Sequence, residues 1–175
     1  MKIQAKEYIT HPADQVFEAI RDKTKEMVTF MPNIEAMEEL SREVDGPTVS
    51  LYNRWQGSND DVPKVVRPFV KKELISWHDR AAWNSETLTC RWEIEAAIGK
   101  EIFSCSGQTS IKPEGEARTL FSLEGELVVN PKKVPGVPRL LAGRLKAPLE
   151  RFIAKAISPN LTSVAKAVQQ YLDQK

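Results

Sequence analysis

The sequence has few of the residues from which metal centres and disulfide frameworks are built. In 175 residues it contains two histidines, His11 and His78, and two cysteines, Cys90 and Cys105. The cysteines lie in strand-like stretches and not at metal-ligand spacing, so we expect reduced thiols in the core. A two-histidine metal site would require the distant His11 and His78 to meet. We therefore expect no metal and no cofactor.

The chain also has very little net charge and no long apolar run. Its formal net charge of +1 argues against a nucleic-acid binder. No apolar run approaches the length of a membrane span, and the opening MKIQ has no signal-peptide core. The sequence therefore predicts a soluble protein of the cytoplasm or an organelle interior, with peripheral membrane contact left open. A 41% apolar content over residues 1–175 favours a single domain with a sizeable core.

What the chain does contain is a regular succession of strand patterns. Residues 2–10 alternate as a half-buried strand, and two short helices follow, one opening at His11-Pro12 and one over residues 26–31. Turn signals such as Asp45-Gly46-Pro47 then separate six strand-like runs. These runs span residues 34–44, 48–56, 72–83, 87–96, 101–112 and 117–130. Such spacing predicts an antiparallel meander.

The last quarter, residues 138–174, predicts a long helix, because its apolar side chains recur every three or four positions. Pro148 and Pro159 would each remove a backbone hydrogen bond, so we expect two or three segments, with Ser158 as a cap before Pro159. A sheet with one solvated face must cover the other. The predicted class is α+β: a curved antiparallel sheet of six to seven strands wrapped around a long C-terminal helix.

Three stretches carry a resemblance to a known superfamily: HPADQVF at 11–17, FMPN at 30–33 and PLERFI at 148–153. Together with the element order, they resemble the helix-grip fold of the START and birch-pollen-allergen (SRPBCC) superfamily over the whole chain. The insert after the third strand and the strand with Trp92-Glu93-Ile94 are also similar to PRELI-type phospholipid transfer domains. The superfamily includes carriers, cyclases and chaperone activators, so the resemblance implies a fold and leaves the function open.

The space between sheet and helix is the first candidate site. Solid core is the commoner origin of apolar stripes, but the resemblance favours a cavity. Gly107 and Gly125 would leave room there, or mark a bulge. The side chains expected to line a cavity and bind a ligand are Leu51, Asn53, Trp55, Phe69, Ile75, Trp77, Cys90, Trp92, Phe103, Phe121, Leu141, Leu145, Leu149 and Phe152.

A second candidate is a basic, amphipathic surface beside that cavity. Residues 62–72 combine helically spaced apolar residues with basic ones, and residues 132–155 hold seven basic residues against one acid. A short edge helix and a solvated face would explain both patterns. The alternative is a lid and a docking surface for a transient anionic membrane or lipid headgroup. The residues expected to make that contact are Lys64, Arg67, Lys132, Lys133, Arg139 and Arg144.

The sequence places no obvious catalytic group. His78, Asp79 and Arg80 are strand neighbours, so Asp79 points to the opposite face from the other two and no triad forms. Ser104 and Cys105 lack a nucleophile elbow. We therefore predict the binding or transport of a hydrophobic small molecule, with a lipid as the expected class. The alternatives are an enzyme of the cyclase or dehydratase type, with Asp79 as its acid or base, and a protein-interaction module with a filled core.

Overall fold

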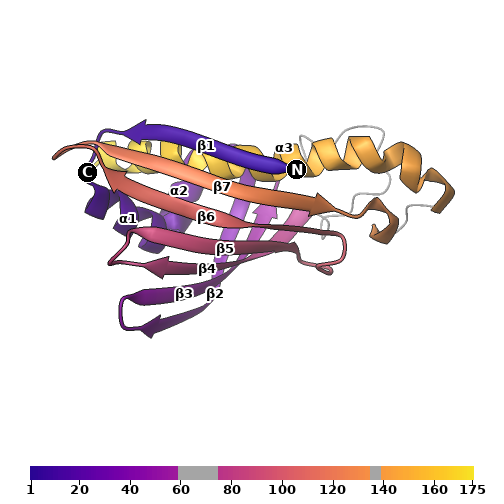
Figure 1. Ribbon diagram of the computed structural model, residues 1–175, viewed down its shortest axis with the longest axis horizontal. Helices are drawn as coiled ribbons and strands as arrows, with labels where there is room; N and C mark the ends of the chain where they lie inside the picture. Colours follow the sequence, from indigo (N-terminus) through magenta and orange to yellow (C-terminus); the bar gives the residue numbers. More distant parts are fainter. Residues whose placement is uncertain (59–74, 135–138) are drawn as a thin grey trace.

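The computed structural model describes the backbone of residues 1–58, 75–134 and 139–175, drawn in colour in Figure 1. Strand β1 (Lys2–Ile9) is followed by helix α1 (Ala13–Asp22), helix α2 (Thr24–Met27) and the 3-10 turn η1 (Val28–Phe30). Six more strands follow in the described chain: β2 (Ile34–Asp45), β3 (Thr48–Gly57), β4 (Ser76–Asn84), β5 (Thr89–Ala96), β6 (Phe103–Pro113) and β7 (Thr119–Val129). The turn η4 (Pro131–Lys133) and helix α3 (Arg139–Asp173) complete the order.

The strands form one seven-stranded antiparallel sheet in the order β1-β7-β6-β5-β4-β3-β2. The first strand closes against the last, so β1 and β2 are the two edges. Helices α1 and α3 cover one face, and α3 runs alongside β1 and β7 (Figure 1). This arrangement confirms the predicted helix-grip class, with two short helices after the first strand.

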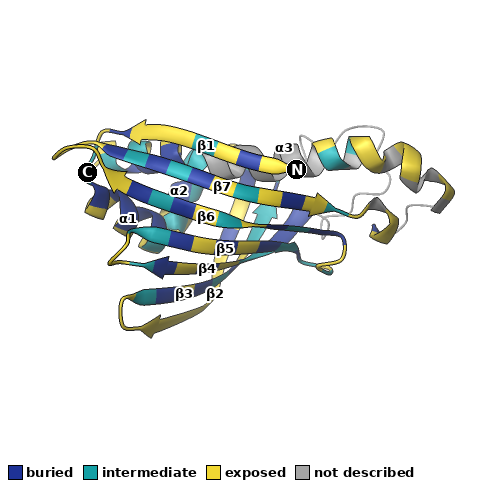
Figure 2. Cartoon of the chain, viewed as in Figure 1, coloured by how far each residue is buried: buried dark blue, intermediate teal, exposed yellow. Residues whose placement is uncertain are grey.

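Alternate residues of each strand point to the helices and to solvent, as Figure 2 shows for β4 and β5. On the covered face, Phe17 of α1 meets Trp83 of β4 edge to face, with ring centroids 5.4 Å apart. The strand predicted over residues 87–96 begins later in the structure, because Leu88 has φ of 50° and lies in the turn before Thr89, the first residue of β5.

Helix α3 is continuous over its 35 residues, so the prediction of two or three segments is wrong. Pro148 and Pro159 both lie inside it. An interior proline removes one backbone hydrogen bond and costs about 3 kcal/mol, which does not break a helix that keeps its other bonds and its packing. Ser158 is accordingly not a cap.

The C-terminal part of α3 is anchored by hydrogen bonds as well as by apolar contacts. The Tyr171 hydroxyl donates to Glu26 of α2 at 2.7 Å, and Lys23, the residue before that helix, donates to the same carboxylate. His11 Nε2 lies 2.7 Å from Asp173 Oδ1. Ala165, Ala167 and Val168 are buried against the sheet and α1. This part of the helix is therefore fixed to the opening of the chain.

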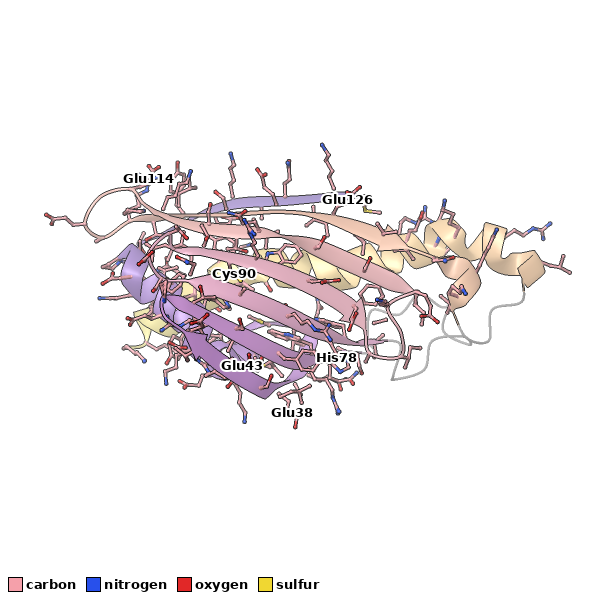
Figure 3. All side chains as sticks on the ribbon, turned by 60° about the horizontal axis from the view of Figure 1, so that its bottom comes forward. Glu38, Glu43, His78, Cys90, Glu114 and Glu126 are labelled. Atoms are coloured by element: carbon pink, nitrogen blue, oxygen red, sulfur yellow. The ribbon has the colours of Figure 1, made fainter. Side chains whose placement is uncertain are left out.

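The N-terminal part of α3 extends past the sheet (Figure 1). There Leu140 is 96% exposed, and no atom of the described residues would lie within 4 Å of a Cβ added at Gly143. Because neighbouring strands are antiparallel, β3, β5 and β7 all finish at this same end of the sheet. Glu114, in the β6–β7 hairpin, marks the opposite end (Figure 3). We call the end where Lys132, Lys133, Leu140 and Arg144 lie the basic end.

Candidate functional site

A cavity of about 100 Å³ lies between the covered face of the sheet and the helices. Strands β3 to β7 supply most of its lining, and Ile20, Thr24, Met31 and Val164 close it from the helical side. This volume is below the roughly 300–1,000 Å³ that is usual for small-molecule sites. The reason is that large side chains, four tryptophans among them, occupy most of the space that the curved sheet encloses.

The structure brings seven of the predicted lining residues together at this cavity: Leu51, Asn53, Trp55, Trp77, Cys90, Trp92 and Phe121. Ile75 and Phe103 are buried in the core but are not among the lining residues. Phe69 lies outside the described residues. The side chains of Leu141, Leu145, Leu149 and Phe152 are likewise outside the described part of α3.

All four tryptophans of the chain line the cavity: Trp55, Trp77, Trp83 and Trp92. Trp55 and Trp77 are directly paired across β3 and β4, and their rings stack with an interplanar angle of 7° and centroids 6.2 Å apart. Trp83 belongs to the lining but was not predicted there. The alternation of the strand already indicated this position, because β4 has Trp77, Asp79, Ala81 and Trp83 at every second residue.

Trp92 occupies the room that Gly107 and Gly125 leave. The two glycines face each other on β6 and β7, and Gly107 also pairs with Trp92 on β5. A Cβ at either glycine would lie within 2.5 Å of the indole ring. The indole Nε1 donates to Thr109 Oγ1 at 3.1 Å, which fixes the ring across the glycines. The two glycines therefore accommodate a side chain of the protein itself.

Asn53 and Asp79 form a polar cluster in the cavity lining. These residues are opposite each other on β3 and β4, and Asn53 Nδ2 donates to Asp79 Oδ2 at 3.2 Å. Burial raises the pKa of Asp79 to about 6, against the opposing effect of hydrogen bonds from Asn53 and Trp55. The sequence identified Asp79 as the best acid or base candidate and Asn53 as a lining residue, but not that they contact each other.

The remaining titratable groups near the cavity are less suited to chemistry. Cys90 lines it, and burial followed by the nearby Asp79 charge raises the pKa of its thiol far above neutrality. Both cysteines are free and buried. His78 packs on Tyr52 with ring centroids 5.2 Å apart, whereas His11 bonds to Asp173. Within the described residues, no group of three potential ligands could hold a metal ion.

The predicted basic surface is described in part. Lys132, Lys133 and Arg144 are exposed at the basic end. Lys64 and Arg67 lie outside the described residues, as does the whole predicted lid over residues 62–72, and so does the side chain of Arg139. Across the part of the chain that is described, no helix has the length and apolar character to cross a membrane.

Comparisons with known proteins agree with this architecture. A family model with the description "Protein of unknown function (DUF2505)" matches residues 5–172. No curated protein matches the sequence. Among solved structures, the Zhui aromatase/cyclase from a Streptomyces species is 16% identical with a TM-score of 0.71, covering 99% of this chain and 94% of that one.

Two further solved structures have the same fold. A START superfamily protein from Mycobacterium smegmatis is 17% identical, has a TM-score of 0.54 and covers 99% of this chain and 97% of its own. Norcoclaurine synthase from Thalictrum flavum is 12% identical with a TM-score of 0.62, and the match covers 100% of this chain and 87% of that one. The resemblance to the START and birch-pollen-allergen superfamily is thereby confirmed for the fold. At these identities the likeness shows the fold alone.

Proposed function

Because this chain belongs to the DUF2505 family of proteins of unknown function, we propose its role from its own geometry: it binds a hydrophobic small molecule between sheet and α3. A lipid is the class that we favour, and the cytoplasm or an organelle interior is the compartment. The observation that carries this proposal is an apolar cavity whose lining includes every tryptophan of the chain. Removing apolar surface from water supplies about 25 cal/mol per Å² of driving force.

The size of the cavity limits what it admits without rearrangement. Its volume of about 100 Å³ is below the roughly 150 Å³ at which an engineered apolar cavity is known to bind benzene. A lipid chain would therefore require the helices to move away from the sheet. Met31 and Met37 are unbranched lining residues that can repack at low cost. Binding with expansion is the form of the proposal that this volume supports.

Neighbouring alanines on β4 provide a matched pair for the test. Ala81 lines the cavity and is buried, whereas Ala82 is exposed on the other face. Purified protein is screened with fatty acids, long-chain alcohols, sterols and polyaromatic probes, by native mass spectrometry and tryptophan emission. We expect Ala81→Leu to weaken binding at least about tenfold by filling the cavity, and Ala82→Leu to leave it unchanged. If no probe binds wild type, the interaction-module alternative is favoured instead.

A second candidate function is catalysis on an apolar substrate, and Asp79 is the observation that favours it. A carboxyl group with a pKa of about 6 in an apolar cavity can both accept and donate a proton near neutrality. A carrier requires no such group. Product formation from a bound ligand would support the enzyme, and it should be lost in Asp79→Asn while binding remains. Unchanged ligand recovered from wild type would support the carrier.

We also propose that the basic end docks on an anionic membrane surface when cargo is exchanged. Exposed Lys132, Lys133 and Arg144 supply positive charge there, and Leu140 at 96% exposure supplies an apolar contact. Val128, at the end of β7, is 57% exposed at the same end. Basic and apolar residues on one surface are the combination that binds membrane interfaces.

A further inference from the structure

The side-chain oxygen Oδ1 of Asn53 is a buried acceptor without a hydrogen bond. Asn53 is 3% exposed, and in the described part of the structure nothing donates to this oxygen. Leaving a buried acceptor unpaired costs free energy, and native proteins rarely do so without a reason. Because Asn53 lines the cavity, a ligand bound there would be placed to supply the missing donor.

The groups beside this oxygen cannot supply the missing donor. The Asn53 amide nitrogen is already engaged with Asp79 at 3.2 Å, and an ionised carboxylate only accepts. Trp55 also donates to Asp79, and the Thr24 hydroxyl donates to the backbone oxygen of Ile20. Among the lining residues that the structure describes, there is no lysine, arginine or histidine. This corner of the cavity therefore presents two acceptors, Asn53 Oδ1 and the Asp79 carboxylate.

We propose that the cavity selects an apolar ligand whose polar end is a hydrogen-bond donor, a hydroxyl or an amine, over the same skeleton ending in a carboxylate. The donor bonds to Asn53 Oδ1 and reaches the Asp79 carboxylate. A carboxylate ligand would meet like charge at Asp79, would leave Asn53 Oδ1 unpaired and would find no cation among the described lining residues. This inference rests on the proposed function and narrows its ligand class: alcohols and amines bind, and ionised fatty acids do not.

The test uses probes with a single ring, which require the least expansion of the cavity: phenol, benzylamine, toluene and benzoate at neutral pH. Binding is followed by the indole N–H resonances of the four tryptophans, which all report on the cavity. Hydrogen bonds to a buried or charged acceptor predict that phenol and benzylamine bind at least about tenfold tighter than toluene. Benzoate should bind more weakly than toluene.

Two variants separate the acceptors. Asn53→Leu removes the unpaired oxygen, so phenol should lose its advantage over toluene while toluene binding persists. Asp79→Asn removes the charge, so benzylamine should weaken most and benzoate should gain. Retained toluene binding shows that each variant still folds around a cavity. The Ala81→Leu variant should exclude all four probes from the cavity. Binding that is lost in this variant therefore takes place in the cavity and not elsewhere on the surface.

The possible outcomes distinguish the two proposals. Equal binding of phenol and toluene, or benzoate as tight as phenol, overturns the donor rule while the hydrophobic-binding function stands. No binding of any probe to wild type, toluene included, overturns both. An unchanged phenol preference in both Asn53→Leu and Asp79→Asn also overturns the inference, because the selectivity would then arise from other groups.

Discussion

The indole of Trp92 lies over Gly125: a Cβ built at residue 125 would be 2.4 Å from the ring atom Cη2. The same ring approaches Gly107, where a Cβ would also be 2.1 Å from the carbonyl oxygen of Glu124. A strand residue with a side chain is excluded at both positions unless the ring or the backbone moves. Three strands therefore depend on one tryptophan and two glycines for their close approach.

We predict that Gly125→Ala and Gly107→Ala each lower the free energy of unfolding by about 1–3 kcal/mol, the usual cost of overpacking a core. Gly107→Ala should cost more, because its Cβ would lie 2.1 Å from backbone of β7, whereas a Cβ at residue 125 would lie 2.9 Å from backbone of β6. Urea denaturation measures both. Gly143→Ala is the control: none of the described residues lies within 4 Å of its Cβ, so alanine should be neutral or stabilise α3 by up to about 1 kcal/mol. A cost below about 0.5 kcal/mol at both strand glycines would show that the ring yields easily.

The sequence predicted the sheet well because strand alternation is a local signal. The inward row of β5, with Cys90, Trp92 and Ile94 on one face, could be read without knowing any partner strand. The start of β5 was predicted too early for a related reason. Alternation does not show where a strand begins, and the turn holds Leu88 at positive φ. The breaks predicted at Pro148 and Pro159 were wrong because the tertiary packing that holds α3 together is not visible in the sequence of the helix itself.

The site was less predictable because it depends on register between strands. Asn53 and Asp79 are 26 residues apart, and their contact follows from the pairing of β3 with β4 across a long connection. The glycines at 107 and 125 indicated space on the inner face, but not that Trp92 would fill it. The small volume of the cavity could not be predicted for the same reason. The side chain that fills the space beside a glycine can belong to a residue on a different strand.

The free energy of unfolding depends on pH through the carboxyl group of Asp79. Burial raises its pKa from 3.8 to about 6, so the folded protein binds this proton more tightly than the unfolded chain does. Its contribution is fully present below about pH 4 and is lost as the pH rises through about 6. At about 1.4 kcal/mol per pKa unit, the loss is at most about 3 kcal/mol. Cys90, which also faces Asp79, stays protonated throughout this window because its pKa is raised.

We therefore predict that Asp79→Asn is more stable than wild type near neutrality and that this advantage shrinks as the pH falls below about 6. Urea denaturation at several pH values measures the difference. Glu26→Gln is the control with the opposite sign, because hydrogen bonds from Tyr171 and Lys23 lower the Glu26 pKa. Its contribution disappears in acid. A constant difference between Asp79→Asn and wild type from acid to neutral pH would contradict the raised pKa.

The last prediction concerns the basic end. Lys132 and Lys133 are exposed there, and each basic residue near an anionic surface contributes about 1 kcal/mol to membrane binding. The double variant Lys132→Glu/Lys133→Glu should therefore bind anionic vesicles at least roughly thirtyfold more weakly than wild type. Vesicle sedimentation with anionic and neutral lipid measures this. Binding should also weaken at high salt, since the Debye length near physiological ionic strength is about 8 Å.

A charge-matched control distinguishes docking from bulk electrostatics. Lys25 and Lys112 are exposed away from the basic end, on α2 and near the β6–β7 hairpin. Reversing both changes the net charge by the same amount and should leave vesicle binding nearly intact. Leu140→Ser should weaken binding without changing its salt dependence, because Leu140 contributes apolar area and no charge. If wild type binds anionic and neutral vesicles equally, or if both double variants behave alike, these lysines are an ordinary solvated surface.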